Sequence, residues 1–435
     1  MTRPATGTLE CLRRFFSVRS GFARNVITLA SGTAAAQSLT ILAAPLLTRL
    51  YRPEDYGVLA LWSAIGGICA LLASGKYEGA ILLPKKDAEA VALVYLSVGL
   101  TAAFALVLLG VVVATGPRIA ALFESPELAP WLLLLPVMLL VTNLGQSLSA
   151  WANRRQAYRV LAGSRITTAV VGTGANLGFG FAGFDAAGLI GGVLSGQVVG
   201  LGFLAWQFWR HDRCGVPTVS EMKTQARRYR DFPRFTVWAD LINVGSTQLI
   251  ALMLPRMFGL AVLGAYAMSQ RVIAVPFTLI GSAVAEVFRG RASRDYAEQG
   301  NCIDVFDKTL KRLAVLGLVA FAVIVFAAPH LFGFVFGEQW RMAGTIAQIM
   351  SVMYVLRFIV SPLTHTFLLA GRQREDLLLH GWILFSSAGS LWLGYHFSKS
   401  ATITLFGFSL NFGSIYLLYL WRSRTFAAGR EAATS

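Results

Sequence analysis

The sequence has few of the groups on which enzyme catalysis and metal binding depend. Its 435 residues include only five histidines and four cysteines. The cysteines stand alone at Cys11, Cys69, Cys214 and Cys302, so none has the spacing of a metal site or a disulfide framework. The chain also lacks a phosphate-binding loop, a nucleophile elbow, a zinc-binding histidine pair and a paired-carboxylate motif. We therefore expect a protein that is not an enzyme and that binds no cofactor and no metal.

Charged residues are scarce as well, at 14% of the chain, whereas 55% of the residues are hydrophobic and the mean hydropathy is +0.60. An apolar stretch of about 20 residues can cross a bilayer as a helix, and such stretches recur here with short polar breaks. The longest polar interval runs only from Arg210 to Phe232, which leaves no room for a separate soluble catalytic domain. The composition predicts an all-α polytopic membrane protein.

The apolar stretches predict twelve transmembrane helices in two sets of six. The first six are expected at residues 25–48, 56–83, 88–114, 129–151, 163–183 and 186–209. The second six are expected at residues 234–257, 263–288, 312–336, 342–369, 377–397 and 401–421.

The net charge of +16 fits membrane topology better than nucleic-acid binding, because lysine and arginine collect in cytoplasmic loops. With twelve spans, most basic residues fall on one side of the membrane. The other side carries only Arg49, Arg52, Arg118, Arg256, Arg341 and Lys399. This asymmetry predicts an inner-membrane protein with both termini in the cytoplasm and no nucleic-acid partner.

The two sets of spans resemble each other weakly, since residues 49–57 can be matched with residues 256–264. A duplication of six spans gives parallel repeats, with a binding site between them. We predict an N-terminal lobe at residues 1–209, a cytoplasmic linker at 210–233 and a C-terminal lobe at 234–435.

The linker carries Arg227, Arg228 and Arg230. These arginines suit an interfacial helix on anionic membrane lipids, and they equally suit a solvated charged loop. Both interpretations remain open.

Four segments together with the twelve spans carry a family resemblance. They are RLYRPEDYG at 49–57, KYEGAILLP at 76–84, YRDFPRF at 229–235 and LGAY at 263–266, and the first is the most distinctive. The chain resembles, over essentially its whole length, the polysaccharide transporter family of O-antigen and exopolysaccharide lipid flippases. That family belongs to the multidrug/oligosaccharidyl-lipid/polysaccharide exporter superfamily.

The resemblance implies a flippase that moves an undecaprenyl-diphosphate-linked oligosaccharide from the cytoplasmic to the periplasmic leaflet by alternating access. Its implied partners are this lipid-linked oligosaccharide, membrane lipids, and a polysaccharide polymerase with its chain-length machinery. One alternative is a cation-coupled drug exporter of the same superfamily, although the deepest charges here are arginines and not carboxylates. A membrane-embedded polysaccharide polymerase or ligase is a further alternative, against which the short predicted periplasmic loops argue.

Ionisable residues within spans are expensive and usually functional, so they are the candidate site residues. Arg357 lies near the middle of the span at 342–369, and Tyr354 and Ser361 share its face at helical spacing. The predicted substrate-binding set is Arg357, Arg271, Glu78, Lys76, Tyr354 and Ser361. For Arg357 the competing interpretation is a structural ion pair, and for Arg271 and Lys76 it is an extended side chain that reaches the headgroups.

A flippase without a nucleotide site draws on another source of energy. Titratable groups in or near the spans suggest coupling to an ion, with protons favoured, and the alternative is the lipid's own gradient, drained by polymerisation in the periplasm. The predicted coupling residues are Asp240, Glu78, Glu286 and His365.

Overall fold

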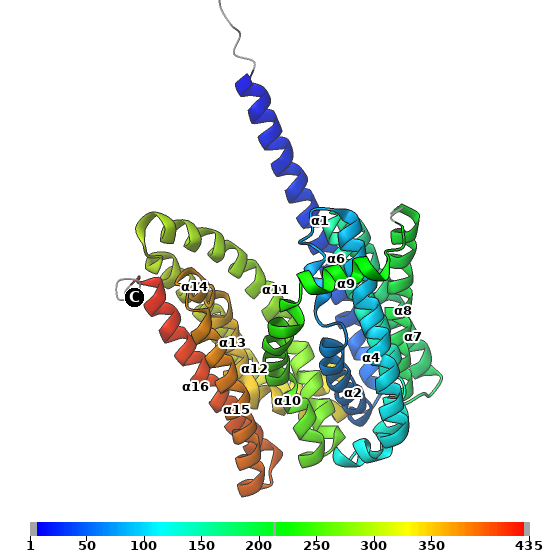
Figure 1. Cartoon of the computed structure of the whole chain (residues 1–435). Helices are drawn as coiled ribbons and strands as arrows, with labels where there is room; N and C mark the ends of the chain where they lie inside the picture. The colour runs from blue at the N-terminus through cyan, green and yellow to red at the C-terminus, as the bar shows by residue number, and fades with distance from the viewer. Residues whose placement is uncertain (1–6, 212–214, 430–435) are drawn as a thin grey trace, which may run out of the picture.

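The computed structural model describes residues 7–211 and 215–429, with side chains from residue 28 on except at positions 211, 275 and 279. Over this range the chain is built of helices (Figure 1). The side chains of Cys11 and Cys214 lie outside the described residues, as do residues 1–6, 212–214 and 430–435 of the predicted lobes and linker.

The helices of the first half pack together on one side of the molecule in Figure 1. They are α1 (Gly7–Leu50), α2 (Pro53–Ala73), α3 (Tyr77–Ala80), α4 (Asp87–Leu122), η1 (Pro126–Leu128), α5 (Ala129–Leu132), α6 (Leu135–Arg154), α7 (Tyr158–Phe181) and α8 (Ala186–His211).

A short helix, α9 (Val219–Arg228), leads into the second half. The second half consists of η2 (Phe232–Thr236), α10 (Val237–Phe258), α11 (Leu260–Gln299), α12 (Ile303–Phe336), η3 (Glu338–Trp340), α13 (Arg341–Val360), η4 (Ser361–Leu363), α14 (His365–Leu369), α15 (Gln373–Ser398) and α16 (Ala401–Ala427).

The number of membrane spans is close to the predicted twelve. Ten described helices are long and apolar enough to cross a bilayer, and a pair bent by 54°, Pro126–Leu132 with Leu135–Arg154, makes eleven. The remaining predicted span, at 163–183, corresponds to α7. Its 24 residues measure about 36 Å at roughly 1.5 Å per residue, but α7 is too polar to qualify by composition. It packs mainly against α1 and α8, which shields part of its surface from lipid.

The predicted span at 56–83 is wrong at its C-terminal end, because α2 stops at Ala73. Gly75 and Lys76 follow with φ values of +59° each, and left-handed residues end a right-handed helix. The chain then forms the four-residue helix α3. Lys76 and Glu78 therefore do not lie on one continuous transmembrane helix.

The same helix pairings occur in both halves, which confirms parallel repeats. The five equivalent pairs are α1–α7 with α10–α15, α2–α6 with α11–α13, α4–α6 with α12–α13, α6–α8 with α13–α16, and α7–α8 with α15–α16. The two lobes meet mainly where α2 packs against α10 and α11, and these helices lie between the two groups in Figure 1.

Two glycines allow a close approach between the lobes. A Cβ on Gly57 would lie 2.1 Å from the carbonyl oxygen of Leu260, and a Cβ on Gly264 would lie 1.7 Å from that of Pro53. The two contacts are reciprocal, because each glycine meets the residue that lies four positions before the other. Only glycine permits this approach, and the reciprocity is what a two-fold relation between the repeats produces.

The junction between α1 and α2 is held by side chains from the other lobe. Gln339 Nε2 and Trp340 Nε1 donate hydrogen bonds of 2.6 Å and 2.8 Å to the Thr48 carbonyl near the end of α1. The Trp340 ring meets that of Tyr56 edge-on, with centroids 5.0 Å apart. These contacts satisfy a helix-end carbonyl that lacks an intrahelical donor, and they close this end of the molecule. We call this set of contacts the interlobe seal.

Candidate functional site

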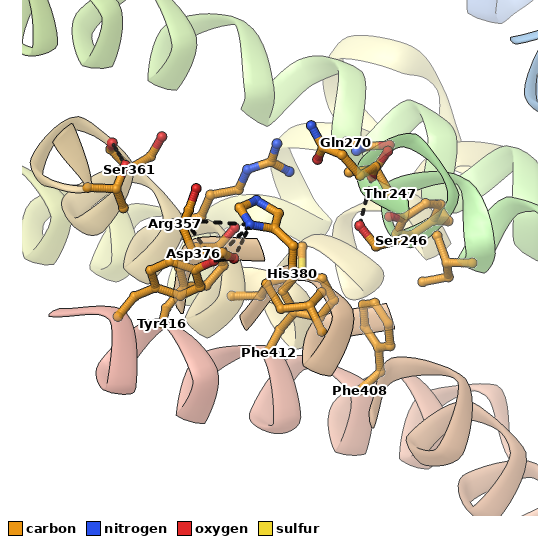
Figure 2. Close-up of a pocket in the computed structure, with 17 residues that line it drawn as sticks. Ser246, Thr247, Gln270, Arg357, Ser361, Asp376, His380, Phe408, Phe412 and Tyr416 are labelled. Atoms are coloured by element: carbon orange, nitrogen blue, oxygen red, sulfur yellow. Dashed lines mark hydrogen bonds and ion pairs between the residues drawn. The ribbon is translucent and has the colours of Figure 1, made fainter. Parts of the chain in front are cut away.

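The C-terminal lobe encloses a polar cavity of about 230 Å³, which we call the C-lobe cavity (Figure 2). Five helical segments line it. Its lining residues are Asn243, Ser246, Thr247 and Ile250 of α10, Tyr266 and Gln270 of α11, Met353, Arg357, Ser361 and Thr364 of the α13–η4 region, Asp376, His380 and Ile383 of α15, and Phe408, Phe412, Tyr416 and Tyr419 of α16.

Arg357 reaches this cavity from the last turn of α13, with its side chain exposed. It makes no ion pair with any carboxylate in the described part of the chain. Ser361 lines the cavity beside Arg357, as the helical spacing predicts, whereas Tyr354 is buried, with 4% of its surface exposed. The helix breaks at Ser361–Leu363, where Pro362 lies, because proline lacks the donor that continues the ladder.

A second cavity of about 360 Å³ opens on the other side of Arg357, against α11. Gln270, Arg357 and Ser361 line both cavities. Tyr354 also lines the second one, together with Thr278. Arg357 therefore lines both spaces.

The N-terminal lobe holds a further cavity of about 510 Å³, the N-lobe cavity. Its lining residues are Thr33, Ala36, Gln37, Thr40 and Ile41 of α1, Ser164, Arg165, Thr168, Ala169, Gly172, Thr173 and Asn176 of α7, Val193 and Gln197 of α8, and Arg271 of α11. Hydroxyl and amide groups dominate its polar lining, and no carboxylate is among these residues.

Arg271 enters the N-lobe cavity from the opposite lobe. Its side chain is exposed and makes no ion pair with any described carboxylate. In the N-terminal lobe itself, Arg165 of α7 donates a hydrogen bond to the Thr33 hydroxyl. The N-lobe cavity thus receives one guanidinium from each lobe, and sequence reasoning had not singled out Arg165.

Lys76, Glu78 and Asp240 form a cluster between the lobes. Lys76 Nζ lies 3.0 Å from Asp240 Oδ2 and 4.0 Å from Glu78 Oε1. The Glu78 side chain is 11% exposed, and its Oε2 is buried without a hydrogen-bond partner. The structure brings these three predicted residues together through a turn that the sequence pattern did not predict.

Two predicted coupling residues lie apart from the cavities described above. Glu286 is exposed on α11 and lines none of the three, and neither does half-buried His365 at the start of α14.

Asp376 and His380 of α15 line the C-lobe cavity with Tyr419 of α16, and sequence reasoning missed all three. His380 Nδ1 lies 2.8 Å from the Asp376 carbonyl oxygen and 3.0 Å from the Tyr419 hydroxyl. The four-residue spacing of Asp376 and His380 places both on one helix face. That spacing is visible in the sequence and was the available signal.

The arrangement can bind an anion. Arginine stays protonated and can donate two parallel hydrogen bonds to phosphate oxygens. Arg357 and Arg271 present unpaired guanidinium groups to polar cavities within apolar helices, where a charge is costly unless it meets a partner.

Comparison with known proteins places the chain in a family. The sequence profile of the family described as polysaccharide biosynthesis protein matches residues 46–344, more than half of the chain. The chain belongs to this family.

Two characterised members of polysaccharide pathways are similar to parts of the chain. The teichuronic acid biosynthesis protein TuaB of Bacillus subtilis (strain 168) is 23% identical over 291 residues, which is 64% of this chain and 59% of TuaB. The lipopolysaccharide biosynthesis protein WzxC of Escherichia coli (strain K12) is 26% identical over 147 residues, 33% of this chain and 30% of WzxC. The matches thus span less than two thirds of either relative.

Solved structures of transporters share the fold. An inward-facing multidrug resistance MATE family transporter of the MOP superfamily superposes with a TM-score of 0.67 at 18% identity, covering 92% of this chain and 96% of the transporter. The outward-facing form of such a transporter gives a lower TM-score, 0.54 at 17% identity, covering 94% of this chain and 97% of the transporter. The lipid II flippase MurJ, in an inward closed conformation, gives 0.67 at 13% identity, covering 91% of this chain and 87% of MurJ. The protein is thus a member of the polysaccharide biosynthesis protein family, and it has the fold that these transporters share.

Proposed function

We propose that this protein is a flippase for an undecaprenyl-diphosphate-linked oligosaccharide and moves it from the cytoplasmic to the periplasmic leaflet. The saccharide serves a surface polysaccharide such as O-antigen or exopolysaccharide. Family membership and the transporter fold support this function. No covalent bond is made or broken in it, so the chain works as a transporter and not as an enzyme.

The observation that carries the proposal is the pair of exposed, unpaired arginines, Arg357 and Arg271, in polar cavities of the two lobes. A diphosphate and its sugar cannot cross hydrocarbon without polar partners, whereas the polyprenyl tail can remain in lipid. Guanidinium groups bind the diphosphate, and hydroxyl and amide groups such as Gln37 and Gln197 suit the sugar.

The orientation follows from the arginine asymmetry of the loops. Both termini lie in the cytoplasm of the bacterial cell, the N-terminal lobe spans 1–209, the linker 210–233 and the C-terminal lobe 234–435. The interlobe seal is then periplasmic and the structure is inward-open. Labelling of single cysteines should find the 49–55 loop accessible from the periplasm and residues 215–231 accessible from the cytosol. Periplasmic labelling of the linker would overturn this topology.

Transport is coupled to an ion gradient in this proposal, with Glu78 and Asp240, which both lie near Lys76 between the lobes, as the central carboxylates. Glu286 and His365 remain predicted participants. Transport in vesicles that is indifferent to uncouplers and to every imposed ion gradient would remove this part of the proposal.

The test of the function is a translocation assay in proteoliposomes. A fluorescent polyprenyl-diphosphate oligosaccharide is inserted, and its leaflet is read with a membrane-impermeant quencher. The protein is expected to move the lipid to the leaflet that the quencher cannot reach. The rate of this movement should be lower for Arg357→Ala. Vesicles that move cationic dyes but not the lipid would identify a drug exporter and refute the flippase.

A further inference from the structure

The C-lobe cavity contains a titratable cluster that the flippase proposal has not used. Tyr419 OH lies 3.2 Å from Asp376 Oδ1, and His380 Nδ1 lies 3.5 Å from the same oxygen. The His380 and Asp376 side chains are 34% and 41% exposed, so water and ligands can reach them. Figure 2 shows the His380 ring and Arg357 facing the same cavity.

The neighbours of His380 determine which ring nitrogen carries the proton. Nδ1 faces the carbonyl of Asp376 at 2.8 Å and the carboxylate of the same residue. Both groups only accept hydrogen bonds, so we assign a proton to Nδ1. The Tyr419 hydroxyl, 3.0 Å from Nδ1, can then donate to the Asp376 carboxylate at 3.2 Å. The second nitrogen, Nε2, makes no hydrogen bond in the described part of the chain. A proton from solution is therefore taken up at Nε2.

The charge of the cavity depends on that proton. Its ionisable lining consists of Arg357 from α13, Asp376 and His380 from α15, Tyr266 from α11, and Tyr416 and Tyr419 from α16. α10 lines the cavity without an ionisable side chain, and its Asp240 is paired with Lys76. Glu375, next to Asp376, is held by Arg422 at 2.6 Å.

With His380 neutral, Arg357 and Asp376 cancel and the cavity has no net charge, since tyrosine is neutral near pH 7. With His380 protonated, its charge offsets that of Asp376 and leaves the charge of Arg357 free. An anion is then attracted by one net positive charge in a site of low dielectric.

We propose that His380 is a proton-binding switch that sets the affinity of the C-lobe cavity for a diphosphate headgroup. This inference rests on the proposed flippase function and adds a proton to its binding step. Diphosphate binding and proton uptake favour each other, because linkage between two ligands is reciprocal. The affinity is therefore higher when a proton is bound at His380 than when it is not.

The experiment measures binding of a short polyprenyl-diphosphate monosaccharide to the full chain in nanodiscs of zwitterionic lipid. This probe is a diphosphate diester, so it has no ionisation of its own near neutral pH. Calorimetry in buffers of different ionisation enthalpy gives the affinity and the protons taken up. Between about pH 8 and pH 5, the range in which histidine titrates, the affinity of the wild type should rise about tenfold, with uptake of up to one proton.

Three variants separate a switch from a structural role. His380→Gln should bind with an affinity that is independent of pH and without proton uptake. Asp376→Asn removes a negative charge and should bind more tightly than the wild type at alkaline pH, which a merely structural defect would not produce. His396→Gln is the matched control, because His396 lies on the same helix but outside the cavity, stacked on Trp392 at 5.4 Å. It should behave as the wild type.

Unchanged pH dependence in His380→Gln would overturn the inference, and so would a wild type whose affinity does not change with pH. Loss of the pH dependence in His396→Gln would overturn it as well. If the wild type translocates lipid in vesicles but shows no proton linkage, only the switch fails. If it neither translocates lipid nor binds the probe, the proposed function fails.

Discussion

A membrane-spanning segment can accommodate the charge of Arg357 because the helix that carries it ends within this segment. α13 stops at Val360, and the segment continues through η4 and α14 to Leu369. A helix C-terminus presents unpaired carbonyls with partial negative charge, which stabilises a cation in the last turn by about 0.3–1 kcal/mol. The proline that breaks the helix thus also makes an arginine tolerable. The guanidinium can contact a ligand directly because it makes no ion pair with any described carboxylate.

The diphosphate role of Arg357 predicts graded damage. Arg357→Lys keeps the charge but loses the two-pronged geometry, so export should fall mildly to moderately. Arg357→Gln and Arg357→Ala should reduce export severely, while membrane abundance stays near that of the wild type. Export in vesicles and abundance in the membrane are measured side by side.

Arg256→Ala is the matched control for this series, since Arg256 is 62% exposed and lies 3.9 Å from Glu124 outside the cavities. It should export normally. Normal export by Arg357→Ala would remove the diphosphate role of this residue.

Single residues of the site were predictable to different degrees. Arg357 was predictable, because an arginine in an apolar span is conspicuous. Ser361 was predictable from its spacing of four residues, which places it on the same helix face as Arg357. The contact of Lys76 with Asp240 was not, because it joins segments more than 160 positions apart across a turn with left-handed residues. Arg165 was not singled out, although it lies in the predicted span at 163–183, and α7 carries it into the N-lobe cavity.

At the scale of elements, glycine determines where the lobes approach. α2 and α11 cross so closely at Gly57 and Gly264 that the carbonyls of Leu260 and Pro53 occupy the space of a side chain. Backbone carbonyls move only with their helices. Any larger residue therefore displaces a whole helix.

Gly264→Ala should consequently destabilise this conformation by about 1–3 kcal/mol, the usual range for overpacking. We expect a lower melting temperature in detergent. Gly407→Ala is the control, because a Cβ at this helical glycine has no heavy atom within 4 Å, and alanine favours helix. It should leave the melting temperature unchanged or raise it. Equal melting temperatures for the two variants would refute the close crossing.

The elements themselves were largely predictable from apolar runs, and the exceptions have physical reasons. Hydropathy extended the second span to residue 83, because it does not detect the left-handed residues that end α2 at Ala73. α7 is a helix at a predicted span although it is polar. Its arginine and amide groups face a cavity rather than lipid, and such a helix is recognised only once its neighbours are known.

The described contacts between the two lobes are concentrated at one end of the molecule. Reciprocal glycine contacts and the interlobe seal join the lobes at one end, where Gln339 and Trp340 of one lobe bond to Thr48 of the other. Each of these hydrogen bonds contributes about 1 kcal/mol net, so the seal is weak enough to open. The cavities of both lobes lie among the membrane-spanning helices. If the interlobe seal opened while the opposite end closed, the cavities would be exposed first to one side of the membrane and then to the other.

Alternating access therefore predicts that locking the seal stops transport. In a background without native cysteines, Tyr56→Cys with Trp340→Cys places one thiol on each lobe, where the rings now lie 5.0 Å apart. A short bifunctional thiol reagent should join them, and translocation in proteoliposomes should fall to the level of empty vesicles. A reducible reagent should allow recovery on reduction.

The control pair is Trp151→Cys with Phe208→Cys, which also replaces two rings in edge-on contact, 5.7 Å apart, but within one lobe. Joining these two should leave translocation intact, because rigid-body motion between the lobes does not separate them. If transport continues with the interlobe pair fully joined, the lobes do not separate at the seal, and the substrate must cross without opening it. If both pairs abolish transport, the loss reflects modification and not closure. Loss confined to the interlobe pair is the outcome that alternating access requires, since only that link spans the boundary along which the two repeats must part.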